Sequence, residues 1–226
     1  MLYNTQKFRG VCIKTATQEY SKIEEIWHTI THGFGLLLSV SALTLLTVFA
    51  AQSGSGLKIA SALVFGIALV LMYGASTLYH GTINPSIKFI FQQLDHCAIY
   101  VLIAGTYTPI CLLGVQGAFG WTLFGISWGI GLIGIILKIV YPSRFETLSL
   151  ILYTLMGWMI VVAIKPLTQH LESLPLWLLV SGGLMYTVGI IFYVWEKLHL
   201  NHAIWHFFVL AGSTLHFFVV LLLILA

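Results

Sequence analysis

The strongest constraint on this chain is a series of long apolar stretches separated only by short breaks. Each stretch has about 18 residues or more, the length that an α-helix needs to cross a bilayer, whereas the strands of a membrane barrel are about ten residues long and alternate in polarity. The sequence therefore predicts an all-α, polytopic membrane protein with a bundle of seven transmembrane helices. We expect the spans at about residues 29–51, 57–81, 91–115, 119–140, 147–164, 174–195 and 202–226.

Composition supports this class and excludes others. Of the 226 residues, 59% are hydrophobic and only 8% are charged, whereas a soluble domain carries about 25% charged residues. So few charges could not cover the surface of a soluble fold, which excludes a soluble enzyme and a nucleic-acid-binding protein. Cys12, Cys97 and Cys111 form no C-x-x-C pair. We expect them to be apolar fillers rather than thiolate ligands or disulfide partners.

The chain divides into a cytoplasmic leader, residues 1–28, and a seven-transmembrane domain, residues 29–226. In the leader, Ser21 and Glu24 have the spacing of a capping box, which predicts a short interfacial helix leading into the first span. Eight lysines and arginines lie in the leader and around the loops after spans two, four and six, against two on the other side. By the positive-inside rule, the N-terminus is inside and the C-terminus outside.

Small residues predict close packing of two helices. Gly125 and Gly129 form a GxxxG motif in the fourth span, and Gly66 and Gly74 share one face of the second. Such motifs let neighbouring helices approach closely in a membrane. Pro109 predicts a kink in the third span, because proline lacks the N–H that would bond the preceding turn.

Polar residues gather at one end of this apolar bundle. Seven of the nine histidines fall at the predicted cytoplasmic ends of spans one, two, three and seven. Asp95, the sole aspartate, lies near the start of span three and is the only carboxylate expected inside a span. An ionisable group within a span is costly, so it indicates a functional site.

The spacing of the histidines indicates a metal site. His202 and His206 are four residues apart, so both imidazoles leave one face of the last span, and His80 closes span two at the same depth. Three histidines and a water are the arrangement of a catalytic zinc site. Asp95 could hold or deprotonate that water. Ser76, one turn before His80, could hydrogen-bond the His80 ring, the water or a substrate carbonyl.

Other histidines leave alternatives open. His28 and His32 are also four residues apart and lie near Glu24 and Glu25, so by spacing alone they compete as metal ligands. His96 follows Asp95 and should point about 100° away from it on the helix. His216 lies about 21 Å deeper than His202 along the last span, so it should bond a neighbouring helix instead. We expect the remaining two, His170 and His199, to be interfacial polar residues.

Several short motifs resemble the progestin and adipoQ receptor family, and most of all its bacterial hemolysin III branch. The combination of their order, spacing and positions in the helices is specific to this family. The similarity extends from about residue 21 to residue 226. The motifs are Ser76-Thr-Leu-Tyr-His80, Asp95 opening the third span, His202-x-x-x-His206 opening the last, Ile30-Thr-His-Gly-Phe-Gly35 and Gly105-Thr-Tyr-Thr-Pro109.

The resemblance implies a seven-helix fold with an inside N-terminus in a bacterial cytoplasmic membrane. It implies zinc in the cytoplasmic half of the bundle, bound by His80, His202 and His206, with Asp95 and Ser76 as adjacent catalytic or water-binding residues. The adiponectin receptors of this family are linked to ceramidase-like hydrolysis, so a membrane lipid is the expected substrate or ligand.

Three functions remain open at this point. The first is a zinc-dependent hydrolase that cleaves an amide or ester bond of a membrane lipid. The second is a non-enzymatic regulator or sensor of membrane fluidity or energetics, with a structural or ligand-gated metal. The third is a transporter, a channel or a cytolytic protein, for which the polar residues form too short a path.

Overall fold

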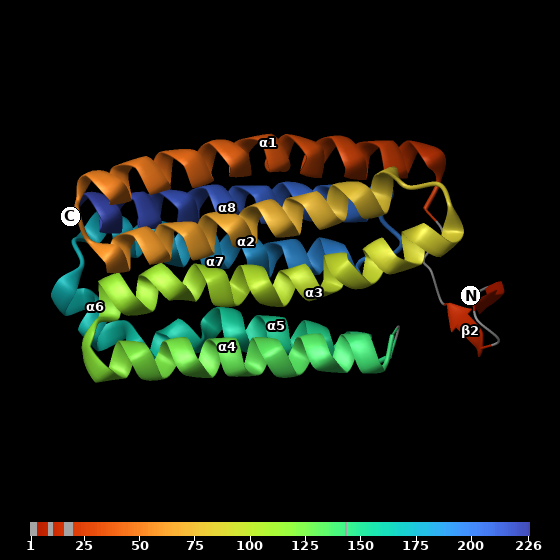
Figure 1. Ribbon diagram of the computed structural model, residues 1–226. Helices are drawn as coiled ribbons and strands as arrows, with labels where there is room; N and C mark the ends of the chain where they lie inside the picture. Colours follow the sequence, from red (N-terminus) through yellow and green to blue (C-terminus); the bar gives the residue numbers. More distant parts are fainter. Residues whose placement is uncertain (1–3, 9–10, 16–19, 143) are drawn as a thin grey trace.

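The structure is a computed structural model, and it describes residues 4–8, 11–15, 20–142 and 144–226. Within these residues, seven helices are long and apolar enough to cross a membrane. The predicted seven-helix bundle is therefore confirmed (Figure 1). A two-stranded antiparallel hairpin precedes the bundle and was not expected from the sequence. It pairs β1 (Asn4–Phe8) with β2 (Val11–Thr15).

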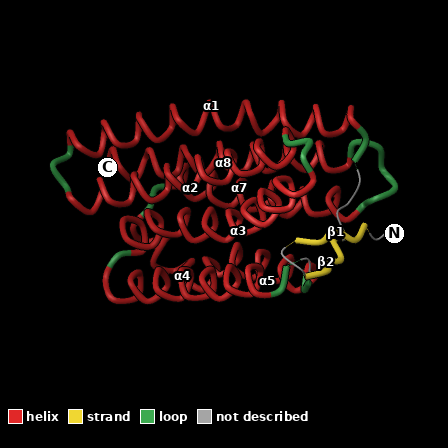
Figure 2. The backbone as a smooth tube through the Cα atoms, turned by 45° about the vertical axis from the view of Figure 1, so that its right-hand side comes forward, coloured by secondary structure: helices red, strands yellow, loops and turns green. Residues whose placement is uncertain are grey.

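Each predicted span corresponds to one helical segment. Figure 2 shows that, apart from the hairpin, the described chain is almost entirely helical. The third span continues through a π-helical turn, η1, and the fifth through a 3₁₀ segment, η2. The elements are α1 (Lys22–Gln52), α2 (Gly56–Gly81), α3 (Pro85–Pro109), η1 (Ile110–Val115), α4 (Gly117–Val140), α5 (Glu146–Trp158), η2 (Met159–Ala163), α6 (Ile164–His170), α7 (Ser173–Val194) and α8 (Asn201–Leu225).

The start of α1 has the predicted capping box. The Glu24 backbone N–H donates to the Ser21 hydroxyl, and the Ser21 backbone N–H donates to the Glu24 carboxylate. Two of the backbone donors that a helix start leaves unpaired are thereby satisfied. From this cap, α1 runs without a break into the apolar stretch, so the boundary expected at residue 28 lies inside one helix.

The bundle core lies between α1, α2, α3 and α8, and α4 and α5 lie on the side of α3 away from α1 (Figure 1). Close approach of α1 and α2 depends on glycine. A Cβ on Gly66 would collide with the backbone of Leu43, and one on Gly35 would collide with the Tyr73 ring. The packing predicted for Gly66 is confirmed.

The GxxxG motif of α4 behaves differently. Gly125 and Gly129 are both exposed, and a Cβ on either would meet nothing within 4 Å. The expectation that they bring two helices of this chain together is wrong. Close contacts of α4 are made instead by Gly134, against the Tyr100 ring of α3, and by Gly120, against the Cys111 carbonyl of η1.

The path of the chain brings four helix ends together. Because the helices alternate in direction, the start of α1, the end of α2, the start of α3 and the start of α8 lie at the same end of the bundle, and the C-terminus lies at the other (Figure 1). These four ends carry most of the ionisable side chains discussed below, although they are far apart in the sequence.

Candidate metal centre

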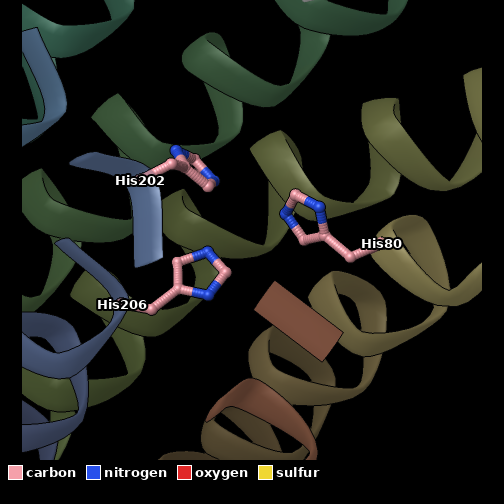
Figure 3. A group of neighbouring side chains, drawn as sticks. All are labelled: His80, His202 and His206. Atoms are coloured by element: carbon pink, nitrogen blue, oxygen red, sulfur yellow. The ribbon is translucent and has the colours of Figure 1, made fainter. Parts of the chain in front are cut away.

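The structure brings His80, His202 and His206 into one buried cluster. His80 comes from the last turn of α2, and His202 and His206 from the first two turns of α8 (Figure 3). All three side chains are buried, and one ring nitrogen of each lies within 4.8 Å of the others. The three residues that the sequence groups together could therefore hold one metal ion.

The start of α8 is held in place by the residue before it, Leu200, and by its first residue, Asn201. Leu200 adopts a left-handed backbone conformation, with φ of 58°, which is costly for a branched side chain and ends the connection from α7. The Asn201 side-chain amide then donates to the carbonyls of Phe192 and Tyr193 in the last turn of α7. These contacts fix the position from which His202 enters the cluster.

Hydrogen bonds fix the orientation of His80 and His206. The Nδ1–H of His80 donates to the Glu25 carboxylate at 2.7 Å. His206 Nδ1 lies 3.1 Å from the Thr31 hydroxyl, whose own hydrogen is directed to the carbonyls of Trp27 and His28. The Thr31 oxygen therefore accepts from His206 Nδ1–H.

The other nitrogens of these two rings are left unpaired. Nε2 of His80 and Nε2 of His206 are buried and have no hydrogen-bond partner among the described residues. Buried polar atoms are normally satisfied, so each exception needs an explanation. Metal-binding histidines commonly donate one N–H to a carboxylate or hydroxyl and present the other nitrogen to the ion. The residues present therefore fit a zinc ion, which imidazole nitrogens bind well.

Glu25 links this cluster to the start of α3. Its second carboxylate oxygen forms an ion pair with Lys88 at 2.9 Å, and the Lys88 ammonium also donates to the carbonyls of Tyr79 and Thr82 at the end of α2. Sequence reasoning did not assign a role to Glu25, Thr31 or Lys88. The available signal was weak: Glu25 and Thr31 each lie three residues from His28 in the sequence.

Ser76 and Asp95 lie together beside the cluster. The Ser76 hydroxyl, one turn before His80 on α2, lies 2.7 Å from Nδ1 of His32 and also contacts the Asp95 carboxyl. The partner of the Ser76 hydroxyl is thus His32, and that of the His80 ring is Glu25. The Asp95 side chain and His202 line the same cavity, described below.

His28 and His32 belong to the same cluster as the three predicted ligands. The His32 ring stacks on His206 with ring centroids 3.5 Å apart, and the His28 ring lies 4.6 Å from His80. Glu25, His28 and His80 form a second group with metal-binding spacing, which shares His80 with the first. The two sets that compete by sequence spacing are therefore parts of one buried cluster.

The remaining polar groups lie around this cluster. His96 faces Glu146 across 3.9 Å, and His216 Nε2 donates to the Leu179 carbonyl of α7, which confirms that His216 bonds a neighbouring helix. The Tyr20 ring covers the cluster from outside the helices, with its centroid 4.7 Å from that of His28 and 5.1 Å from that of His202. Burial raises the pKa of the Tyr20 hydroxyl well above its usual range, so it stays protonated at neutral pH.

A cavity of about 1170 Å³ extends from this end of the bundle between α3, α5, α7 and α8. Asp95 and His202 line it beside the cluster, His216 lines it further along α8, and Ser173 and Trp177 line it at the opposite end of α7. Most of its lining is apolar. Sites for small molecules usually have about 300 to 1,000 Å³, so this cavity is large enough for a long-chain ligand.

The fold and the site together define a class: a polytopic membrane protein with a buried histidine cluster at one end of a seven-helix bundle and an elongated cavity beside it. Within that class the chain belongs to the haemolysin III family, because the family model described as "Haemolysin-III related" matches residues 20–217.

Curated relatives agree with this assignment. The chain is 48% identical to Hemolysin-3 of Bacillus cereus over 202 residues, which cover 89% of this chain and 92% of the relative. It is also 48% identical to the Hemolysin-3 homolog of Bacillus subtilis (strain 168) over 198 residues, 88% of this chain and 93% of that protein. A more distant relative, the human monocyte to macrophage differentiation factor, is 26% identical over 168 residues, 71% of this chain and 68% of that protein.

Proposed function

We propose that this chain is a membrane-embedded, zinc-dependent hydrolase that cleaves an amide or ester bond of a membrane lipid. The observation that carries the proposal is the pair of buried, unpartnered Nε2 atoms on His80 and His206, whose rings are oriented by Glu25 and Thr31. This arrangement adjoins a cavity long enough for an acyl chain, and His202 lines that cavity. His80, His202 and His206 would hold the ion.

When bound, zinc would supply Lewis acidity toward the scissile carbonyl and lower the pKa of water at the site. The protein groups would perform the proton transfers. Asp95 accepts a proton from the attacking water as its oxygen bonds to the carbonyl carbon, and it returns that proton to the leaving amine or alcohol as the old bond breaks. The Ser76 hydroxyl, in contact with the Asp95 carboxyl, orients it.

Metal content is the first test. Wild-type protein purified without a histidine tag should contain about one zinc per chain by mass spectrometry, and the His202→Ala/His206→Ala protein should contain none. Wild-type protein grown with zinc but purified without any metal would refute the proposal.

Lipid turnover is the second test. Asp95→Asn should keep its zinc and lose about 100-fold or more in the rate of lipid hydrolysis, because the proton acceptor is gone. Ser76→Ala should also slow hydrolysis. Ser61→Ala is a matched control, because Ser61 is a buried serine nearer the opposite end of α2. Zinc-loaded Asp95→Asn and Ser76→Ala proteins that turn over lipid as fast as the wild type would exclude this mechanism.

A specific observation favours a second candidate, a non-enzymatic regulator or sensor of the membrane. The His28 ring lies next to His80 and His202, and neither of its nitrogens has a hydrogen-bond partner in the part of the chain that the structure describes. A fourth imidazole would close the site, and closed four-ligand zinc sites are structural. Stoichiometric zinc without any hydrolysis product would favour this function. Two of the relatives are named as hemolysins, and a lytic assay on vesicles tests that activity separately.

We also propose a location. The lysines and arginines of the described chain concentrate at the histidine end of the bundle, which supports a cytoplasmic N-terminus and an external C-terminus. The two similar relatives come from Bacillus species. Together these observations support the bacterial cytoplasmic membrane as the site of action.

A further inference from the structure

The lining of the large cavity has an uneven charge distribution. Among the residues that the structure describes, it contains three carboxylates, on Asp95, Glu146 and Glu196, and neither lysine nor arginine. Proteins recognise phosphate and carboxylate groups mainly through arginine and lysine. A lipid with an anionic head would therefore find no side-chain cation among the lining residues, and it would meet carboxylates instead.

Two of the three carboxylates already have partners in the protein. Glu146 forms an ion pair of 2.7 Å with the buried ammonium of Lys138, and Asp95 contacts Ser76. Glu196, in the connection after α7, forms no ion pair or hydrogen bond with any described residue. It lines both the large cavity and a smaller polar hollow of about 310 Å³, so it lies where the two meet. Lys197 lines only the smaller hollow.

A second, independent feature of the same end is a buried acceptor without a donor. Gln92 lines the cavity and is only 7% exposed. Its side-chain nitrogen donates to the Tyr79 hydroxyl, whereas its side-chain oxygen has no hydrogen-bond partner within the described ranges. A buried acceptor of this kind costs free energy while it lacks a donor.

Aromatic rings complete this end of the cavity. Tyr20, Tyr79, Tyr193 and Trp205 all line it, and the rings of Tyr193 and Trp205 lie 5.1 Å apart. The face of an aromatic ring attracts a cation, and groups of such rings recognise ammonium ligands. An unpaired acceptor, a free carboxylate and aromatic faces are together the complement of a head with N–H donors and positive charge.

We propose that the cavity selects a lipid whose head carries an ammonium group, with Glu196 as its counter-charge. The inference rests on the proposed function in that the same cavity would hold the substrate, and it narrows the substrate class to amine-bearing lipids. A long-chain amine and the ethanolamine head of a phospholipid share this chemistry. Lipids whose only charge is negative should bind more weakly.

The test compares ligands that share one chain and differ in charge. Full-length protein in a non-ionic detergent is titrated with hexadecylamine, hexadecanol and hexadecanesulfonate, and bound ligand is measured by native mass spectrometry. The amine should bind about tenfold more tightly than the sulfonate. Glu196→Gln should reduce amine affinity about three- to tenfold and leave hexadecanol affinity unchanged, because an exposed ion pair makes a modest contribution. Glu172→Gln is the matched control at the other end of α7, outside the lining.

Two further arms separate the outcomes. If the protein binds lysophosphatidylethanolamine as well as hexadecylamine, the ligand is a phospholipid with an ethanolamine head. If it binds only hexadecylamine, the ligand is a free long-chain amine. Either result supports the proposal. The His206→Ala protein, whose substituted side chain does not line the cavity, should keep the preference even if zinc binding or hydrolysis fails. Sulfonate binding as tight as amine binding, or an unchanged amine affinity in Glu196→Gln, would overturn the inference.

Discussion

At the scale of single residues, the chemistry of the histidine cluster depends on the groups that hold each ring. His80 and His206 can each present Nε2 to a metal because Nδ1 is occupied, by Glu25 in one case and by Thr31 in the other. A neutral imidazole has one donor nitrogen and one acceptor nitrogen, so fixing the first defines the second. The two contacts make separate predictions.

Glu25→Gln should weaken zinc binding about 10- to 100-fold. The amide oxygen can still accept from His80 Nδ1, but it carries no charge, and Lys88 loses the partner of its ion pair. Zinc affinity is measured by competition with a chromophoric chelator in detergent. Glu24→Gln is the control, because Glu24 lies in the same turn and bonds only Ser21. Equal zinc affinities of the Glu25→Gln and wild-type proteins would contradict the role of Glu25.

Thr31→Val should also weaken zinc binding, by a smaller factor of about three to ten. Valine keeps the shape of threonine but cannot accept the hydrogen of His206 Nδ1, which lies 3.1 Å from the hydroxyl. The same chelator competition measures the effect. Thr29→Val removes a hydroxyl of the same helix that donates only to the Glu25 carbonyl. A larger loss of zinc in Thr29→Val than in Thr31→Val would contradict this account.

These residues also mark how far the sequence predicts the site. The three histidines were predicted together because the spacing of His202 and His206, and the placement of His80 at a span end, are local patterns. The partners of the rings were not, because Glu25 is 55 residues from His80 and Thr31 is 175 residues from His206 in the sequence. Such pairs depend on the rotation of α1 against α2 and α8, which no periodicity in the sequence encodes.

At the scale of helices, apolar length predicted all seven spans, whereas their packing was predicted unevenly. Span length follows from bilayer thickness, so it can be counted along the sequence. A small-residue motif shows only that close approach is sterically allowed. Gly66 of α2 packs against Leu43 of α1, but Gly125 and Gly129 of α4 face outward. The β1–β2 hairpin was not predicted because a short polar leader carries no comparable pattern.

This difference between glycines can be measured. Gly66→Ala should destabilise the protein by about 1 to 3 kcal/mol, because the new methyl group would meet the Leu43 backbone and push α1 from α2. Gly125→Ala should leave stability unchanged or slightly raised, because its surroundings are open and alanine favours a helix. Thermal unfolding midpoints in detergent give the comparison. A Gly125→Ala protein that is destabilised as much as Gly66→Ala would show that the α4 motif has a packing role.

At the scale of the whole molecule, an odd number of spans couples topology to the position of the histidine cluster. The cluster lies at the same end of the bundle as the α2–α3, α4–α5 and α7–α8 connections, which contain or adjoin Lys88, Lys138, Arg144 and Lys197. Lys58 and Lys165 adjoin the opposite end. Because positively charged loops stay in the cytoplasm, the cluster should face the cytoplasmic leaflet and the C-terminus should be external.

Reporter fusions test this arrangement. Alkaline phosphatase, which is active only outside the cytoplasm, should be active when fused after Ala226 and inactive when fused after Lys197. Green fluorescent protein should show the reverse pattern, since the two fusion points lie at opposite ends of α8. Replacing Lys58 with glutamine should change neither result, because that change only increases the charge asymmetry. An active phosphatase at Lys197 would show that the bundle has the opposite topology, with the cluster and Glu196 on the external side. The lipid would then have to enter from the outer leaflet.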